Sequence, residues 1–310
     1  MFGREEEMLK ISVAMATYNG ESYIKEQLVS LAEQIRRPDE VIIADDCSQD
    51  STVDIIKEFI AERELPWKLV EGKTNLGFKK NFRKALSLTT GDVVFLCDQD
   101  DVWCEDKIEC ISGVFADNPQ ALAVNSSFTV IDGEGFAHPL DKSRGKNNYG
   151  MLPKISGTVT RVRFKDVFHR NISPGCTMAA RGELVREYVR LTECALPHDW
   201  ELNLMAASRQ GLFFCNAPLI KYRIHDSNAI GLAVKPQSRT DIAKEKAAAA
   251  MAVKKYSGRG GLYAFCDRRY RALERSSLTG VLGLWFCGNY YRFFPLRERI
   301  GDILYIFGRK

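Results

Sequence analysis

Three carboxylates come directly after a short apolar run in the first third of the chain. Residues 93–97 are all apolar and lead into Asp98, Asp100 and Asp101. Such a run predicts a buried strand that delivers these acids to its carboxyl end. Asp98 and Asp100 lie on one side of an extended chain, about 7 Å apart at their Cα atoms. Because Mg²⁺ takes one or two carboxylates together with substrate phosphate oxygens, the spacing predicts a metal–diphosphate site with Asp100 and Asp98 as ligands. Asp101 is expected to cap the segment that follows.

Polar residues also follow two other predicted strands. Residues 10–16 lead into Thr17-Tyr18-Asn19, and residues 40–44 lead into Asp45-Asp46. Strands and helices alternate over the first hundred residues, which predicts an α/β fold with a doubly wound, mostly parallel sheet flanked by helices. Ligands bind such sheets at the edge formed by the carboxyl ends of the strands. Three polar sets at one edge favour a binding site over the alternative, an acidic surface loop.

The remaining periodicity predicts the other elements. Strands are expected at 67–70, 121–124, 128–131, 172–180, 212–215 and 219–223, and helices at 21–35, 53–60, 78–88, 106–115, 183–191, 201–208, 241–256 and 262–276. Residues 133–160 are expected to form an irregular loop on the acceptor side. The chain is expected to divide into an α/β domain, residues 1–232, and a helical appendage, residues 233–310.

Composition narrows the function classes. The chain has 310 residues, of which 45% are hydrophobic and 27% charged, and a formal net charge of +4. With no basic block in the first two hundred residues, this charge gives no support for nucleic-acid binding. The nine cysteines include no C-x-x-C pair, which argues against a zinc ribbon and fits the reduced thiols of a cytosolic protein. Residues 1–10 lack the apolar core of a signal peptide, and no 18-residue apolar run predicts a transmembrane helix.

The end of the chain has a different character. Residues 278–310 combine aromatic side chains, glycines and arginines. This mixture predicts a segment that lies on an anionic membrane surface. The alternatives are packing on the first domain, or on a second protomer in a homodimer formed through the C-terminal helices.

A nucleotide-diphospho-sugar would use the polar groups at the sheet edge. Asp46 can accept a hydrogen bond from a uracil- or thymine-type N–H, and Thr17 and Tyr18 can pack the base. Lys79 or Lys80 can assist a cation in neutralising charge that develops on the leaving phosphate. The alternative for both lysines is a solvated helix face.

Transfer of the sugar to a hydroxyl group requires a general base. Asp199 is the candidate, because the start of a helix favours an ionised carboxylate. A base on the far side of the sugar implies a single displacement with inversion at the anomeric carbon. His225 can complete the metal shell or bind phosphate, and can equally be a structural loop histidine.

Three other classes are less consistent with these residues. A Rossmann dehydrogenase needs G-x-G-x-x-G after the first strand, where this chain has a single glycine, Gly20. A sugar nucleotidyltransferase usually carries a glycine-rich, basic loop at that point, and none is present. A non-catalytic nucleotide-sugar- or glycan-binding protein would have little reason to keep Asp98, Asp100 and Asp199 together.

Four ordered segments resemble one enzyme family. They are residues 12–20 (SVAMATYNG), 41–52 (VIIADDCSQDST), 75–77 (NLG) and 97–103 (CDQDDVW). Together they resemble the inverting family 2 glycosyltransferases, which have the GT-A fold. Two later segments, 198–200 (HDW) and 222–228 (YRIHDSN), are similar to the bacterial rhamnosyltransferase-like branch. The resemblance covers about residues 8–232.

The resemblance implies transfer of rhamnose or a hexose from a TDP- or UDP-sugar to a hydroxyl of a lipid-linked or cell-surface polysaccharide. It also implies bound Mg²⁺ or Mn²⁺ and a peripheral location at the cytoplasmic face of the bacterial membrane. Many relatives place Glu before the catalytic Asp, where this chain has His198. Taken with the residue chemistry, the expected donor contacts are Ala16 (through its backbone), Thr17, Tyr18, Asp46, Asn75, Lys79 and Asp98; the metal ligands are Asp100, Asp98 and His225; the base is Asp199; and the sugar or acceptor contacts are Trp103, His198 and Trp200, with core packing as the alternative for the two tryptophans.

Overall fold

The computed structural model describes residues 9–138, 157–192, 194, 196–225, 249–256, 260–275, 277–294 and 296–307. Within them the strands are β1 (Ile11–Thr17), β2 (Glu40–Asp45), β3 (Lys68–Glu71), β4 (Val93–Cys97), β5 (Val102–Trp103), β6 (Ala123–Ile131), β7 (Val159–Arg161), β8 (Met178–Arg181) and β9 (Leu212–Arg223). They form a single sheet in the order β3-β2-β1-β4-β8-β6-β9-β5, and β7 pairs with β9.

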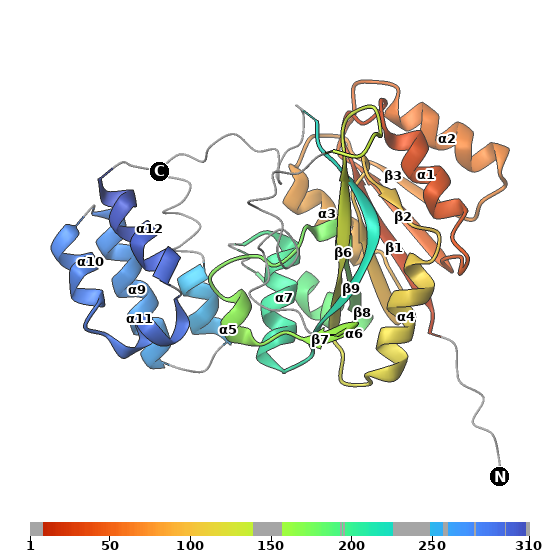
Figure 1. Ribbon diagram of the computed structural model, residues 1–310. Helices are drawn as coiled ribbons and strands as arrows, with labels where there is room; N and C mark the ends of the chain where they lie inside the picture. The colour runs from red at the N-terminus through yellow and green to blue at the C-terminus, as the bar shows by residue number, and fades with distance from the viewer. Residues whose placement is uncertain are drawn as a thin grey trace, which may run out of the picture.

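Helices cover both faces of this sheet. The helices of the described residues include α1 (Ile24–Ala32), α2 (Thr52–Glu62), α3 (Phe78–Ser87), α4 (Lys107–Asp117), α5 (Phe164–Val167), α6 (Gly182–Arg190), α7 (His198–Ser208), α9 (Gly260–Glu274), α10 (Leu278–Leu284), α11 (Gly288–Phe293) and α12 (Leu296–Ile306), with a 3₁₀ turn, η1, at Gly175–Thr177. Helices α1, α2 and α4 lie on one side of the sheet, and α3, α6 and α7 lie on the other (Figure 1). The predicted α/β class is therefore confirmed.

The first four strands are parallel and place the predicted polar residues at one edge. β1 pairs with β2 and β4, and β2 pairs with β3. In this register Thr17 lies opposite Asp45, and Met15 lies opposite Cys97. β1, β2 and β4 are almost completely buried, as their apolar runs predict for strands covered on both faces. The acids after β2 and β4 therefore reach the same edge as Thr17.

The second half of the sheet differs from the prediction. Two strands are predicted at 121–124 and 128–131, but one strand, β6, runs from 123 to 131, and β9 likewise replaces the two strands predicted at 212–215 and 219–223. Polar or turn-forming residues interrupt both apolar runs, and the β6–β9 pairing is irregular at Ser126–Ser127. Strands β5 and β7 and helix α5 were not predicted, since each is only two to four residues long.

Two segments near the acid cluster also depart from expectation. In the segment 172–180, the strand begins only at Met178 and is preceded by the 3₁₀ turn η1. Helix α7 begins at His198 rather than Glu201, so Asp199 lies within its first turn. Pro197 precedes the helix in an extended conformation (φ −53°, ψ 149°), which suits a residue just outside a helix start.

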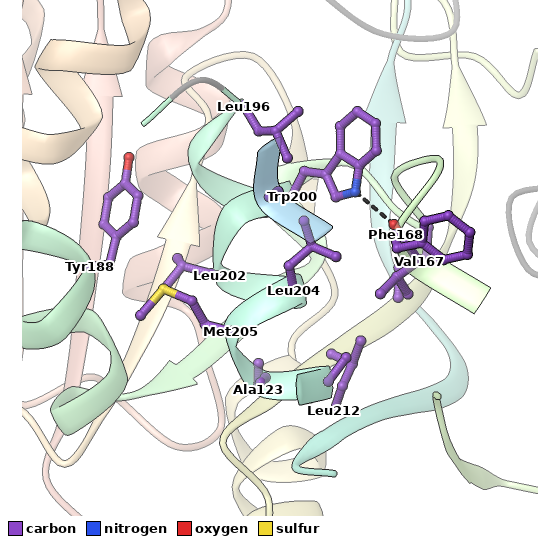
Figure 2. Close-up of a cluster of buried hydrophobic side chains, with 14 of the residues drawn as sticks. Ala123, Val167, Phe168, Tyr188, Leu196, Trp200, Leu202, Leu204, Met205 and Leu212 are labelled. Carbon is purple, nitrogen blue, oxygen red and sulfur yellow. Dashed lines mark hydrogen bonds between the residues drawn. The ribbon is translucent and has the colours of Figure 1, made fainter. Parts of the chain in front are cut away.

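Each face of the sheet has its own apolar core. Trp200 on α7 belongs to the core between the sheet and helices α3, α6 and α7. Its side chain is 3% exposed, and its indole nitrogen donates a hydrogen bond to the Val167 carbonyl oxygen at 2.7 Å (Figure 2). This bond joins α5 to α7.

The C-terminal helices pack against the α5–α7 side of the sheet domain (Figure 1). Phe294 meets Phe168 edge-on at 5.6 Å between ring centroids, and His169 Nε2 lies 3.1 Å from Glu298 Oε1. Arg269 and Asp302 form a buried bidentate pair within these helices at 2.6 and 2.7 Å. No helix among the described residues is long and apolar enough to cross a membrane.

Several predicted features lie outside the described residues. They are most of the loop at 133–160, the first part of the helix predicted at 241–256, the residues Asp226-Ser227-Asn228 and the expected domain boundary at 232/233.

Candidate active site

The acid cluster after β4 lies against the 3₁₀ turn η1, with Asp101 and Cys176 buried and Asp98 partly buried. Ligand atoms of Asp98, Asp101 and Cys176 lie within 4.8 Å of one another. Burial, together with the charges of the neighbouring acids, raises the pKa of Asp98 well above its usual range and that of Asp101 to about 7. Burial also raises the pKa of the Cys176 thiol. The cluster is therefore an electrostatically costly arrangement, which a divalent cation would relieve.

Asp101 holds the end of β9 rather than capping a helix. Its Oδ1 accepts a hydrogen bond from the Arg223 backbone N–H at 3.0 Å. The N-cap residue of the next helix, α4, is Asp106, so the capping role predicted for Asp101 is wrong. A carboxylate that is 1% exposed needs donors from the fold, and the end of β9 supplies one.

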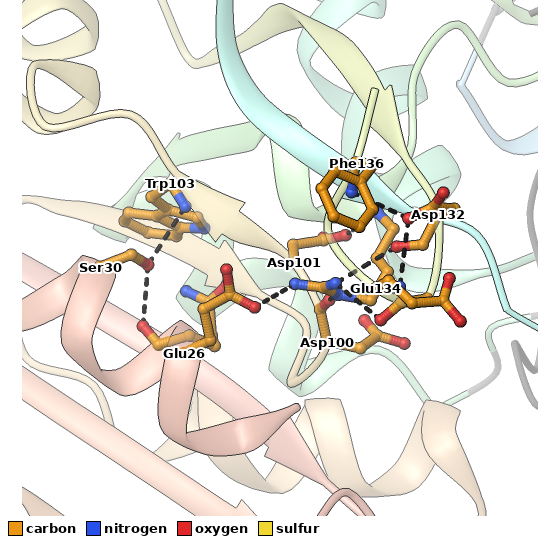
Figure 3. A network of polar contacts seen from close by, with 11 residues as sticks. Glu26, Ser30, Asp100, Asp101, Trp103, Asp132, Glu134 and Phe136 are labelled. Carbon is orange, nitrogen blue, oxygen red and sulfur yellow. Dashed lines mark hydrogen bonds and ion pairs between the residues drawn. The ribbon is translucent and has the colours of Figure 1, made fainter. Parts of the chain in front are cut away.

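Asp100 pairs with His225, and Arg223 holds the backbone of the acidic loop that carries Asp100. His225 Nε2 lies 2.9 Å from Asp100 Oδ2. The Arg223 guanidinium donates to the Asp100 carbonyl oxygen at 2.8 Å, to the carbonyl oxygens of Asp132 and Gly133, and to the carboxylate of Glu26 on α1 (Figure 3). This buried arginine therefore ties β9, α1 and the turn after β6 to the acidic loop, and it brings two of the predicted metal ligands together.

A buried lysine lies beneath the cluster. Lys107 has no exposed surface, its Nζ donates to the Cys176 carbonyl oxygen at 2.7 Å, and the same atom lies 3.3 Å from the centroid of the Trp103 ring. Burial lowers its pKa to about 8, against the opposing effect of the nearby thiols and acids. The side chain therefore stays charged at neutral pH and partly offsets the acids above it.

The predicted donor residues lie along the ends of β1 and β2. Thr17 Oγ1 donates to Asp45 at 2.9 Å, and Tyr18, 43% exposed, exchanges backbone hydrogen bonds with the Gln99 side chain. Asp46 is 3% exposed and accepts the backbone N–H groups of residues 76 and 77 at 2.7 and 2.8 Å. It therefore fixes the turn that carries the predicted Asn75. Ala16, at the end of β1, is partly buried.

Asp199 reaches the acid cluster from a hundred residues further along the chain. Gly175, at the start of η1, lies against it, because a Cβ on that glycine would come 3.4 Å from the Asp199 Cβ. The next residue, Cys176, is part of the acid cluster. The Asp199 charge also contributes to the raised pKa of Asp98. Asp199 Oδ2 accepts a hydrogen bond from Asn171 at 2.6 Å, and its side chain is largely buried.

His198 lies beside Asp199 at the same helix start, and it also approaches Gly175: a Cβ on that glycine would come 3.2 Å from His198 Nε2. Its ring stacks on Phe82 with 4.1 Å between centroids, and neither ring nitrogen has a hydrogen-bond partner among the described residues. Burial lowers its pKa, with the nearby Lys79 acting in the same direction and Asp199 opposing both. His198 is therefore neutral at physiological pH. Lys79, in the first turn of α3, therefore lies close enough to His198 at the start of α7 for its charge to act on the imidazole.

Comparison with known proteins identifies the family of the chain. A model of the family described as glycosyl transferase family 2 matches residues 12–179, more than half of the chain. The chain belongs to glycosyl transferase family 2. It is a glycosyltransferase that takes its sugar from a nucleotide-sugar donor, as the sequence predicted.

Two curated relatives share parts of this family 2 chain. The dTDP-rhamnosyl transferase RfbG of Shigella flexneri is 28% identical over 229 residues, which cover 70% of this chain and 73% of RfbG. The poly(ribitol-phosphate) beta-N-acetylglucosaminyltransferase TarS of Staphylococcus aureus is 39% identical over 97 residues, which cover 30% of this chain and 17% of TarS.

Two solved structures confirm the GT-A type fold. The structure of S. aureus TarS residues 1–349 with UDP has a TM-score of 0.61 at 19% identity, covering 94% of this chain and 79% of that one. The mannosyltransferase PcManGT from Pyrobaculum calidifontis, in complex with GDP-Man and Mn²⁺, has a TM-score of 0.54 at 18% identity, covering 97% and 86%.

The acid cluster of this family 2 enzyme fits a hard divalent cation. Asp98, Asp100 and Asp101 offer carboxylate oxygens, the ligands that Mg²⁺ prefers, and His225 adds an imidazole of the kind that first-row metals such as Mn²⁺ also accept. Asp101 Oδ2 is buried, and the Cys176 thiol hydrogen-bonds to the Asp101 carboxylate. A cation bound by Asp98 and Asp101 would take the place of that thiol proton.

The two tryptophans predicted as sugar contacts lie in the core. Trp103 and Trp200 are each 3% exposed, the first against Lys107 and the second between α5 and α7. Neither ring presents a face for a sugar, so the structure supports the alternative, core packing. Sequence reasoning missed Lys107, Cys176, Asn171 and Arg223, whose importance depends on which distant segments they meet.

Proposed function

We propose that this glycosyltransferase is inverting and metal-dependent, and that it moves rhamnose or a hexose from a TDP- or UDP-sugar to a hydroxyl of a glycan or lipid-linked acceptor. One observation supports the proposal: Asp199 lies against Gly175, and the next residue, Cys176, shares a cluster with Asp98 and Asp101, about a hundred residues earlier than Asp199. Direct transfer of a sugar to a hydroxyl requires a general base for the hydroxyl proton and a cation for the leaving diphosphate, and a carboxylate beside a cation site can supply both.

Each residue has a distinct role in this mechanism. Asp100 and His225, with Asp98 beside them, would hold the cation, which when bound supplies positive charge to the leaving diphosphate. Asp199 accepts the proton of the acceptor hydroxyl while that oxygen forms its bond to the anomeric carbon. The bond from this carbon to the diphosphate breaks at the same time on the opposite side, so the configuration inverts. Asp199 then releases the proton to solvent.

The relatives support the choice of donor. RfbG is named as a dTDP-rhamnosyl transferase, and TarS has been solved with UDP and with UDP-GlcNAc. Both donors carry a pyrimidine base, which matches the role proposed for Asp46 and the Thr17-Tyr18 turn at the strand ends.

The first test is metal-dependent stabilisation by the nucleotide product. UDP or TDP with Mn²⁺ at about 100 times the dissociation constant is expected to raise the melting temperature by about 5 °C, measured by differential scanning fluorimetry. Nucleotide without the cation, or Mn²⁺ with EDTA, is the control. No shift with either nucleotide would contradict the proposal.

The same shift is expected to depend on pH. Because the pKa of Asp101 is raised to about 7, a cation held beside it by Asp98 and Asp100 must drive off at pH 6 a proton that is absent at pH 8. The shift should therefore be smaller at pH 6. Without metal the sign is opposite: the folded protein binds more protons than the unfolded chain between about pH 4 and 7, so this group lowers stability as pH rises. Equal shifts at both pH values would remove Asp101 from the cation site.

We further propose that residues 1–232 form the transferase domain and that the helical region after it contacts an anionic membrane surface. Helix α12 and the residue that follows it carry exposed apolar residues at helical spacing: Leu296, Ile300, Leu304 and Phe307, between 39% and 60% exposed. The acids of this helix point inward, because Glu298 pairs with His169 and Asp302 with Arg269. An apolar stripe without exposed acids suits anionic lipid.

Serine at all four stripe positions is expected to reduce sedimentation with phosphatidylserine-containing vesicles about tenfold, since apolar burial drives interfacial binding. The control is Ile35→Ser with Phe136→Ser, two residues 60% and 72% exposed on the sheet domain. Point changes are preferred to truncation, because Leu284, Tyr290 and Phe294 belong to the main core. If the serine variant sedimented with vesicles as the parent does but had a different mass in light scattering, the apolar stripe would be a contact with a second copy of the chain.

A further inference from the structure

Three asparagines connect the middle of the sheet to the proposed base. Asn125 on β6 donates through Nδ2 to Asn203 Oδ1 on α7 at 2.8 Å. Asn203 Nδ2 donates to Asn171 Oδ1 at 3.2 Å, and Asn171 Nδ2 donates to Asp199 Oδ2 at 2.6 Å. All three amides donate in one direction, toward the carboxylate. We call this set the amide chain.

The amide chain occupies positions where apolar residues would pack as well. Asn125 and Asn203 are 0% exposed. Their neighbours on β6 and α7, such as Val124 and Leu204, are core residues. A buried amide is costly unless it is hydrogen-bonded. Asn125 Oδ1 has no hydrogen-bond partner among the described residues. The amide chain therefore ends in a hydrogen bond at Asp199 and begins at Asn125 with an oxygen that accepts none there.

The direction of the chain has an electrostatic consequence. Amides linked head to tail polarise one another, so the last donor is stronger than an isolated amide. Asn171 is the last donor, and it lies on the segment between α5 and η1, outside helix and strand. Its Oδ1 accepts both the Ile172 backbone N–H at 2.9 Å and the Asn203 amide. Asn203 therefore anchors the residue that contacts Asp199.

We propose that Asn171 is a positioning residue for Asp199 and that Asn203 and Asn125 hold it in place. This inference rests on the proposed function, in which Asp199 is the base. The Asn171 bond fixes Oδ2 and the rotation of the carboxylate, which leaves Oδ1 to accept the proton of the acceptor hydroxyl. A base held in one orientation is in line with the attacking oxygen for a larger share of the time.

The test compares Asn171→Leu, Asn171→Asp and Asn203→Leu with the parent. The matched controls are Asn216→Leu and Asn216→Asp, at an exposed asparagine on β9. The activity probe is Mn²⁺-dependent hydrolysis of dTDP-rhamnose or UDP-N-acetylglucosamine, whichever the parent cleaves faster, and UDP or TDP affinity is measured by calorimetry. Asn171→Leu is expected to lower kcat about 10- to 100-fold and to change nucleotide affinity less than about twofold.

A second readout does not depend on turnover. The Asp199 carboxyl ¹³C signal, assigned by its loss in Asp199→Asn, is expected to titrate at higher pH in Asn171→Leu, because a hydrogen bond that favours the charged form is lost. Asn171→Asp should move it further, since it places a second carboxylate against the first. Neither Asn216 variant should move it. A purely structural role for Asn171 would lower the melting temperature without moving this midpoint.

The outcomes separate the two proposals. If Asp199→Asn loses hydrolysis while the Asn171 variants keep kcat and the titration midpoint of the parent, the amide chain has no positioning role and the base assignment stands. If Asp199→Asn keeps parental hydrolysis, the base assignment itself fails. If Asn203→Leu is too unstable to measure, the Asn171 variants decide, because Asn171 is only partly buried.

Discussion

Replacing Asp199 with asparagine is expected to lower kcat about 10²- to 10⁴-fold while leaving nucleotide affinity unchanged. Loss of a general base has an effect of this size. The amide has the same shape as the carboxylate, and its oxygen can still accept the Asn171 hydrogen bond seen at 2.6 Å. Helix α7 should therefore keep its position. The measurements are Mn²⁺-dependent hydrolysis of the nucleotide sugar and calorimetric titration with UDP or TDP.

The matched control for this substitution is Asp54→Asn. Asp54 is also an acid in the first turn of a helix, α2, but it is exposed and lies on the other face of the sheet. Any effect of removing a charge from a helix start should appear equally in both variants. A kcat for Asp199→Asn within about threefold of the parent would exclude Asp199 as the base, whatever its position.

The strands that carry the site could be predicted because they are buried on both faces. β1, β2 and β4 read as continuous apolar runs followed at once by polar residues, and the parallel register then places those residues at one edge. Asp199 was predicted as the base because a helix start favours an ionised carboxylate, and the family resemblance implied the same role. Periodicity does not show which distant helix start meets the acidic loop.

The features that were missed break the usual relation between polarity and exposure. Asn125 and Ser126 look like the gap between two strands, yet both are 0% exposed within the single strand β6. Lysine and arginine are rarely buried fully, and Lys107 and Arg223 are buried because carboxylates and carbonyl groups from distant segments surround them. Such roles depend on tertiary contacts that no local pattern encodes.

Replacing Asp100 with asparagine is expected to abolish the Mn²⁺-dependent part of nucleotide binding. Asp100 offers a carboxylate beside His225, 2.9 Å away, on a loop whose backbone Arg223 holds. A neutral amide is a much weaker ligand for a hard cation than a carboxylate is, so the affinity for UDP or TDP with Mn²⁺ should fall to its value in EDTA. Calorimetric titration with and without the cation measures both.

This loss should not come from unfolding, because the metal-free variant is expected to be at least as stable as the parent. The Asp100 charge raises the pKa of both Asp98 and Asp101, so removing it relieves repulsion among buried acids. Asp117→Asn, at an exposed acid on α4, should change neither affinity nor melting temperature. If nucleotide binding by Asp100→Asn depended on Mn²⁺ as in the parent, the cation would instead be bound by Asp98, Asp101 and Cys176, whose ligand atoms lie within 4.8 Å of one another. If the variant kept the melting temperature of the parent but its nucleotide binding no longer depended on Mn²⁺, the result would support Asp100 as a ligand of the cation.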